Sequence, residues 1–77
     1  MKLYVIKDLQ ENYYINIELW NNENKEELKK EFANYIRKYD EKDLTYLTDD
    51  EIFSIYEYKI ELIELNNLNH NNIKNKI

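Results

Sequence analysis

The side chains that most often perform catalysis are scarce in this sequence. His70 is the single histidine and lies among asparagines, and Ser54 is the single serine. The chain has no cysteine and no glycine, so a thiolate nucleophile, a thiolate metal site and a glycine-rich phosphate loop are all excluded. We therefore predict no catalytic residues, no metal site and no cofactor.

Carboxylates are the remaining groups with acid and base chemistry. Glu57 and Glu61 stand four positions apart and are a minor candidate for an enzyme, but catalysis would require one of them to be desolvated so that their pKa values separate. Asp49, Asp50 and Glu51 are consecutive and lack the alternating ligands and central glycine of a calcium loop. We therefore expect a protein that is not an enzyme.

The acidic residues are concentrated in one segment. The 77 residues include 16 acids and 11 bases, which gives a net charge of −5. Residues 40–64 contain nine of the acids and two of the bases. Such a segment repels phosphate and attracts basic surfaces, so we predict a protein partner with a basic surface and no direct nucleic-acid binding. A solvated acidic face without a partner explains the pattern equally well.

Aromatic residues are the second candidate for partner binding. The sequence has eight tyrosines and one tryptophan, which give large contact areas at little entropic cost. Their spacing assigns Tyr13, Tyr35 and Tyr39 to the core. For Tyr14, Trp20 and Tyr58, a core role and an interface role both stay open. The predicted partner-binding residues are Asp49, Asp50, Glu51, Glu57, Glu61, Glu64, Tyr14, Trp20 and Tyr58.

The first half of the chain predicts a hairpin followed by a helix. Residues 2–7 and 13–20 are typical of strands, and the polar residues 8–12 have the length of a hairpin loop. Asn24 and Glu27 have the spacing of a capping box, and apolar residues recur at helical spacing up to position 39, so a helix is expected over residues 25–39. Its predicted apolar stripe consists of Leu28, Phe32, Tyr35, Ile36 and Tyr39.

The second half of the chain supports two interpretations. Leu44, Tyr46 and Leu47 are expected to tuck under the core within a charged connection. Residues 48–51 fit a second capping box, and a helix could continue beyond it, whereas residues 56–62 alternate as a strand does. We predict one helical turn over residues 49–52 and then a strand from Phe53 to Leu65.

These elements predict a small α+β domain of order β-β-α-β, with one helix packed on a three-stranded sheet. We expect a single domain over residues 1–65 and a polar, frayed tail over residues 66–77. The absence of cysteine and the short apolar run at the start favour a cytoplasmic protein without a membrane segment. The strand alternation predicts an open sheet face that carries Tyr14, Glu18, Trp20, Glu57, Lys59 and Glu61.

The order of these elements resembles that of small accessory proteins from phages and mobile elements. The resemblance covers residues 3–65 and is carried by Tyr4-Val5-Ile6-Lys7, Tyr13-Tyr14, Trp20, the charged amphipathic helix and the acidic strand that ends the fold. This group includes anti-CRISPR inhibitors, several of which are acidic and occupy the basic nucleic-acid channels of RNA-guided nucleases. The resemblance implies that role for the acidic segment here.

Two classes of function follow from these observations. The first is a phage-type inhibitor of a host defence complex that occludes a basic nucleic-acid groove through its acidic surface. The second is a small structural or regulatory module that forms a homodimer or larger homo-oligomer, in which the exposed sheet edge pairs with its own copy.

Overall fold

The computed structural model describes residues 1–64 and confirms the α+β class. The predicted tail of residues 66–77 and His70 lie outside the described residues, as does Leu65. Within residues 1–64 there are two helices and four strands, where the sequence predicts one helix and three strands. The elements are β1 (Lys2–Asp8), β2 (Tyr13–Tyr14), β3 (Asn21–Asn22), α1 (Lys25–Tyr39), α2 (Asp49–Ile55) and β4 (Tyr58–Glu64).

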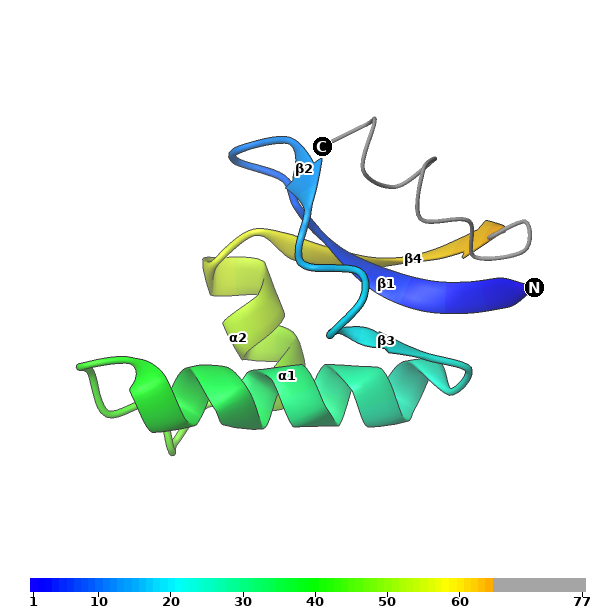
Figure 1. The fold of residues 1–77 in the computed structure, drawn as a ribbon. Coiled ribbons are helices and arrows are strands. Elements are labelled where there is room, and N and C mark those ends of the chain that lie inside the picture. The colour runs from blue at the N-terminus through cyan, green and yellow to red at the C-terminus, as the bar shows by residue number, and fades with distance from the viewer. Residues whose placement is uncertain (65–77) are drawn as a thin grey trace.

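The sheet is antiparallel and is built around β1. Strand β4 pairs with β1 along its whole length, from Lys2 opposite Glu64 to Asp8 opposite Tyr58. The other edge of β1 is shared by β2, which pairs with its C-terminal end at Lys7 and Asp8, and β3, which pairs with its middle at Tyr4 and Val5. Both helices lie on the same side of this sheet, and α2 runs from α1 towards β4 (Figure 1).

The helix boundaries follow from their caps. Helix α1 has the predicted bounds, and the Asn24 side chain accepts a hydrogen bond of 3.0 Å from the Glu27 N–H. The reciprocal half of the predicted capping box is replaced, because the Asn24 N–H donates to Asn22 Oδ1. Helix α2 begins with the complete capping box of Thr48 and Glu51 that the sequence predicts.

The predicted strand over residues 13–20 is wrong beyond Tyr14. Asn16 ends it, because its carbonyl oxygen accepts hydrogen bonds from the Leu19 and Trp20 N–H groups and its side chain accepts a second one from Leu19. Asparagine offers the backbone such local bonds in place of a sheet ladder. The alternation is therefore lost, Leu19 is 68% exposed, and Trp20 packs against the core on the helix side of the sheet.

The predicted strand over Phe53–Leu65 begins five residues later than expected. Helix α2 continues to Ile55, because Ile52 and Phe53 both become buried in the core in a helical conformation. The chain then reverses at Glu57, whose positive φ of 58° supplies the left-handed turn that a glycine would usually make. The sheet alternation of β4 starts only after this turn.

The core lies between the helices and the sheet. It consists of Ile6, Leu28, Phe32, Ala33, Leu44, Ile52 and Phe53. Leu47 packs against it as predicted, but Tyr46 is 77% exposed, so the prediction that Tyr46 is tucked under the core is wrong. Among residues 1–64, neither helix has the length and apolar content needed to cross a membrane.

Candidate functional site

The acids at the start of α2 are engaged by α1. Asp49 forms an ion pair of 2.8 Å with Arg37, and Asp50 forms one of 2.7 Å with Lys29. The hydrogen bond from Lys29 to Asp50 is the main reason why the pKa of Lys29 is raised. Glu51 accepts the Thr48 N–H as part of the capping box. These three predicted partner-binding acids therefore contribute to the fold.

The remaining predicted acids lie on or beside β4 and are separated from one another. Glu57 sits in the turn before β4 and accepts from Gln10 Nε2 at 2.7 Å. Glu64 pairs with the N-terminal amino group at 2.6 Å, and this hydrogen bond lowers its pKa. The structure thus distributes the six predicted acids between the first turn of α2 and the length of β4, and it does not gather them into one cluster.

Tyr14 and Glu61 meet on the sheet face away from the helices, as the alternation predicts. The Tyr14 hydroxyl donates to Glu61 Oε1 at 2.8 Å, and this bond raises the pKa of Tyr14. Lys7 Nζ lies 5.6 Å from the centre of the Tyr14 ring. Trp20 is not on this face, so the prediction that it is an exposed anchor beside Tyr14 is wrong.

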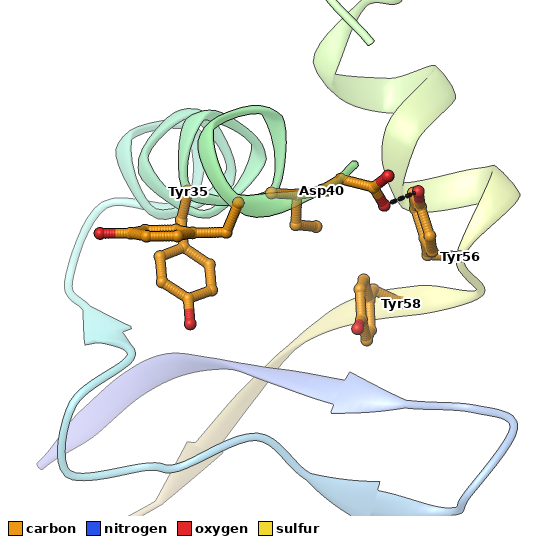
Figure 2. A pocket seen from close by; sticks show the side chains of 6 residues that line it. Tyr35, Asp40, Tyr56 and Tyr58 are labelled. Atoms are coloured by element: carbon orange, nitrogen blue, oxygen red, sulfur yellow. Dashed lines mark hydrogen bonds between the residues drawn. The ribbon is translucent and has the colours of Figure 1, made fainter. Parts of the chain in front are cut away.

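An open hollow on the helix side of the sheet brings together aromatic residues from three elements. Its volume is about 200 Å³, which matches a single side chain better than a drug-sized ligand. Figure 2 shows Tyr35 of α1 on one side, and Tyr56 at the end of α2 together with Tyr58 of β4 on the other. The lining residues are Tyr35, Ile36, Tyr39, Asp40, Tyr56 and Tyr58. We call this site the tyrosine hollow.

The rings of the tyrosine hollow are held in place by neighbouring aromatics. Trp20 packs edge-on against Tyr35 with ring centres 5.1 Å apart, and Tyr39 lies 5.0 Å from Tyr35 on the next helical turn. On the opposite wall, Tyr56 stacks on Tyr58 at 6.2 Å, and Phe32 of the core contacts Tyr58 at 5.2 Å. Trp20 therefore positions Tyr35 from behind.

Asp40 gives the hollow a negative charge. One of its carboxylate oxygens accepts from the Tyr56 hydroxyl and the other accepts the Lys42 N–H at 2.8 Å. The bond from Tyr56 is the main cause that lowers the pKa of Asp40, and the same bond raises the pKa of Tyr56 to about 12. Tyr56 is therefore held as a neutral phenol, and Asp40 as a carboxylate.

The helix ends add to this negative potential. Helix α1 ends at Tyr39 and helix α2 ends at Ile55, so residues at both C-termini line or adjoin the hollow. The carbonyl end of a helix carries a partial negative charge. Lys38 Nζ lies 5.4 Å from the centre of the Tyr39 ring, so a cation of the chain itself is already beside this ring.

This combination of groups favours the binding of a cation. Aromatic faces attract ammonium and guanidinium groups within about 6 Å of the ring centre, and the Asp40 carboxylate adds a direct charge interaction. Within residues 1–64 there is no group of three or more histidine, cysteine or acidic residues that could hold a metal ion. Aromatic faces beside a carboxylate are groups that attract organic cations such as ammonium and guanidinium.

The sequence names Tyr58 as a candidate for partner binding, but it places two other residues that line the hollow in the core. Periodicity assigns Tyr35 and Tyr39 to the buried stripe of α1, yet they are 45% and 65% exposed. The stripe widens towards the end of α1, and the core there is too small to cover both rings. The only signal in the sequence was the unusual density of tyrosines near the ends of the two helices.

Comparison with known proteins does not add a family. The chain matches no protein-family model, no curated protein and no solved structure.

Proposed function

We propose that this protein is a non-enzymatic binding protein whose tyrosine hollow receives an arginine or lysine side chain from a basic protein partner. The observation that carries the proposal is the convergence of four tyrosines and Asp40 at the ends of both helices. Exposed aromatic rings that are braced from behind are typical of interface anchors, because little entropy is lost when they bind. The acidic balance of residues 40–64 attracts the same kind of partner.

The hollow is tested with a short arginine-rich peptide and the same peptide carrying glutamine in place of arginine. Tyr39→Leu keeps the net charge and removes the most exposed ring of the hollow. A cation–π contact contributes about 0.5–2 kcal/mol, so the affinity for the arginine peptide should fall about two- to thirtyfold, as measured by chemical-shift titration. The glutamine peptide should bind weakly to both proteins.

Tyr46→Leu is the matched control. Tyr46 is another exposed tyrosine, but it lies outside the hollow, in the connection between the helices. Both variants leave every charge in place, so general acidity cannot explain a difference between them. Equal affinities of the Tyr39→Leu and Tyr46→Leu variants for the arginine peptide would overturn the assignment of the hollow.

The more specific form of the proposal is that the partner is a host defence complex of the RNA-guided nuclease kind. The protein would cover a basic nucleic-acid groove, as its resemblance to anti-CRISPR inhibitors implies. Asp40 in the hollow would face the cations of the groove. The mechanism is steric and electrostatic occlusion, and it requires no chemistry at the site.

This form is tested by measuring target-DNA binding by purified RNA-guided nuclease complexes with and without the protein. Inhibition should weaken with Tyr39→Leu, persist with Tyr46→Leu and decrease at high salt. Reversing Asp49 or Asp50 is unsuitable as a test, because it would place like charges beside Arg37 or Lys29 in the fold. If the hollow binds the arginine peptide but no complex is inhibited, the binding function stands and the inhibitor assignment fails.

A further inference from the structure

Within the described residues, strand β4 has one edge without a partner strand. Over residues 1–64 it pairs with β1 only, in a continuous one-to-one register of seven residues. No proline or bulge interrupts β4, and of the features by which natural edge strands limit further pairing it carries charged side chains, including Lys59 and Glu61. This edge is independent of the tyrosine hollow, apart from Tyr58, which belongs to both.

Two backbone hydrogen bonds fix which groups of β4 point outwards. The Ile6 carbonyl accepts from the Ile15 N–H on the β2 and β3 side of β1, so Ile6 turns its backbone away from β4. Ile60 lies opposite Ile6 in the antiparallel pair of β1 and β4. Because opposed residues either both bond to each other or both point away, Ile60 also turns its N–H and C=O away from β1. The bond from the Leu9 N–H to the Glu57 carbonyl agrees, since odd-numbered residues bridge the two strands there. The outward-pointing backbone groups belong to Tyr58, Ile60 and Leu62.

We propose that this edge binds a second copy of the chain in antiparallel orientation, with a two-fold axis at Ile60. Ile60 then lies opposite Ile60 of the second copy, and Tyr58 lies opposite Leu62. Because these residues all direct their backbone groups outwards, each such pair exchanges both of its hydrogen bonds. The two central sheets join into one continuous sheet through an interface that is the same on both copies.

Charge complementarity selects this register. On the face away from the helices, Lys59 of each copy lies opposite Glu61 of the other, which gives a matched ion pair on both sides of the axis. An axis at Glu61 would place two glutamates opposite each other. An axis at Leu62 would leave Glu61 opposite Ile63. Only the register centred on Ile60 pairs the opposite charges of this strand.

The side chains around the edge are compatible with this contact. Lys59 is 59% exposed and lies 3.8 Å from Glu61 of its own chain, so the two charges can exchange this contact for the equivalent one between the copies. Glu61 also accepts from the Tyr14 hydroxyl, which holds its carboxylate on the same face. Leu62 is half exposed and would be covered by Tyr58 of the second copy.

Analytical ultracentrifugation of the full chain over a broad range of concentrations tests the proposal. The wild-type protein should form dimers, and in the dimer the amides of Tyr58, Ile60 and Leu62 should exchange more slowly. Lys59→Glu and Glu61→Lys each bring like charges together across the axis and should raise the dimer dissociation constant at least about tenfold. Lys30→Glu and Glu31→Lys change the same charges on exposed positions of α1 and should leave the dimer unchanged.

A charge exchange distinguishes the register from general effects of charge or folding. The double variant Lys59→Glu, Glu61→Lys restores both ion pairs and should dimerise like the wild-type chain, although it also loses the Tyr14 bond to Glu61. A mixture of the two single variants should form a heterodimer for the same reason. The proposal would be overturned by a wild-type protein that is monomeric at every concentration, or by a dimer whose dissociation constant is unchanged in the single variants. It would also be overturned if the edge bound only a strand from another protein, or if the double variant did not recover dimerisation.

Discussion

Asp40 and Tyr56 connect two helices through one hydrogen bond. Asp40 caps the end of α1 and Tyr56 caps the end of α2, so their contact fixes the angle at which the walls of the tyrosine hollow meet. The residues are sixteen positions apart and belong to no recognisable motif, so the sequence alone could not have indicated this pair. The caps Asn24 and Thr48, in contrast, were predictable because their partners lie only three residues away.

The Tyr56 bond predicts a late step in the alkaline titration of this protein. The pKa of Tyr56 is raised from its ordinary 10.0 to about 12 by its bond to Asp40. Since the folded value lies above the unfolded value, the bond stabilises the fold fully below about pH 10 and its contribution is lost as the pH rises through about 12. The phenolate absorbance should show a tyrosine that ionises near pH 12, and Tyr56→Phe should remove that step.

Variants of the carboxylate separate this effect from simple burial of the ring. Asp40→Asn should shift the Tyr56 ionisation towards 10, because the charge that accepts the phenol proton is gone. Asp43→Asn is the control, since that carboxylate accepts from Thr45 and does not contact a tyrosine. Identical titration curves for Asp40→Asn and the wild-type protein would contradict the role given to Asp40.

At the scale of elements, residues 49–64 contain two sequence patterns that favour different structures, a helix and a strand. The capping box of Thr48 and Glu51 correctly predicted where a helix begins, and the alternation after Tyr58 correctly predicted a strand that pairs with β1. The predicted start of the strand was wrong. Phenylalanine is common in strands, but Phe53 is helical here and packs against Phe32 and Tyr58. Such contacts between distant residues are absent from a periodicity pattern.

The helical register of α2 predicts unequal effects of two isoleucine substitutions. Ile52 is fully buried in the core, whereas Ile55 is 57% exposed on the same helix. Ile52→Ala should therefore lower the free energy of unfolding by about 2–5 kcal/mol, because it leaves a cavity. Ile55→Ala should change it by about 0.5 kcal/mol or less. Urea denaturation monitored by circular dichroism measures both values.

A domain of this size has little stability to lose, so Ile52→Ala could prevent folding altogether. Ile52→Val removes only one methylene and should cost about 0.5–1.5 kcal/mol, which keeps the comparison measurable. If the Ile55 variants are as destabilised as the Ile52 variants, the helix does not present the face described here.

At the scale of the whole molecule, the acids that meet α1 fall into two groups. Lys29 and Arg37 are the half-buried bases of this helix, and both are neutralised by acids at the start of α2. Asp40, directly after the end of α1, accepts from Tyr56 and lines the tyrosine hollow. The sequence predicted the net charge of the acidic segment. It could not indicate that Asp49 and Asp50 form ion pairs with bases of α1, whereas Asp40 faces the hollow.

This arrangement predicts that the isolated protein has no measurable affinity for duplex DNA or single-stranded RNA at moderate salt. Nucleic-acid binding requires several cations that are free to release the counterions of the phosphates, and here the net charge of −5 opposes the approach of any polyanion. Fluorescence anisotropy of labelled oligonucleotides measures the affinity, and the arginine-rich peptide serves as a positive control for binding. Complex formation with DNA or RNA that weakens steeply as salt is added would show that the bases of α1 are available after all. The proposed occlusion of a basic groove would then be untenable, because a protein that itself attracts nucleic acid would recruit the substrate that it is proposed to exclude.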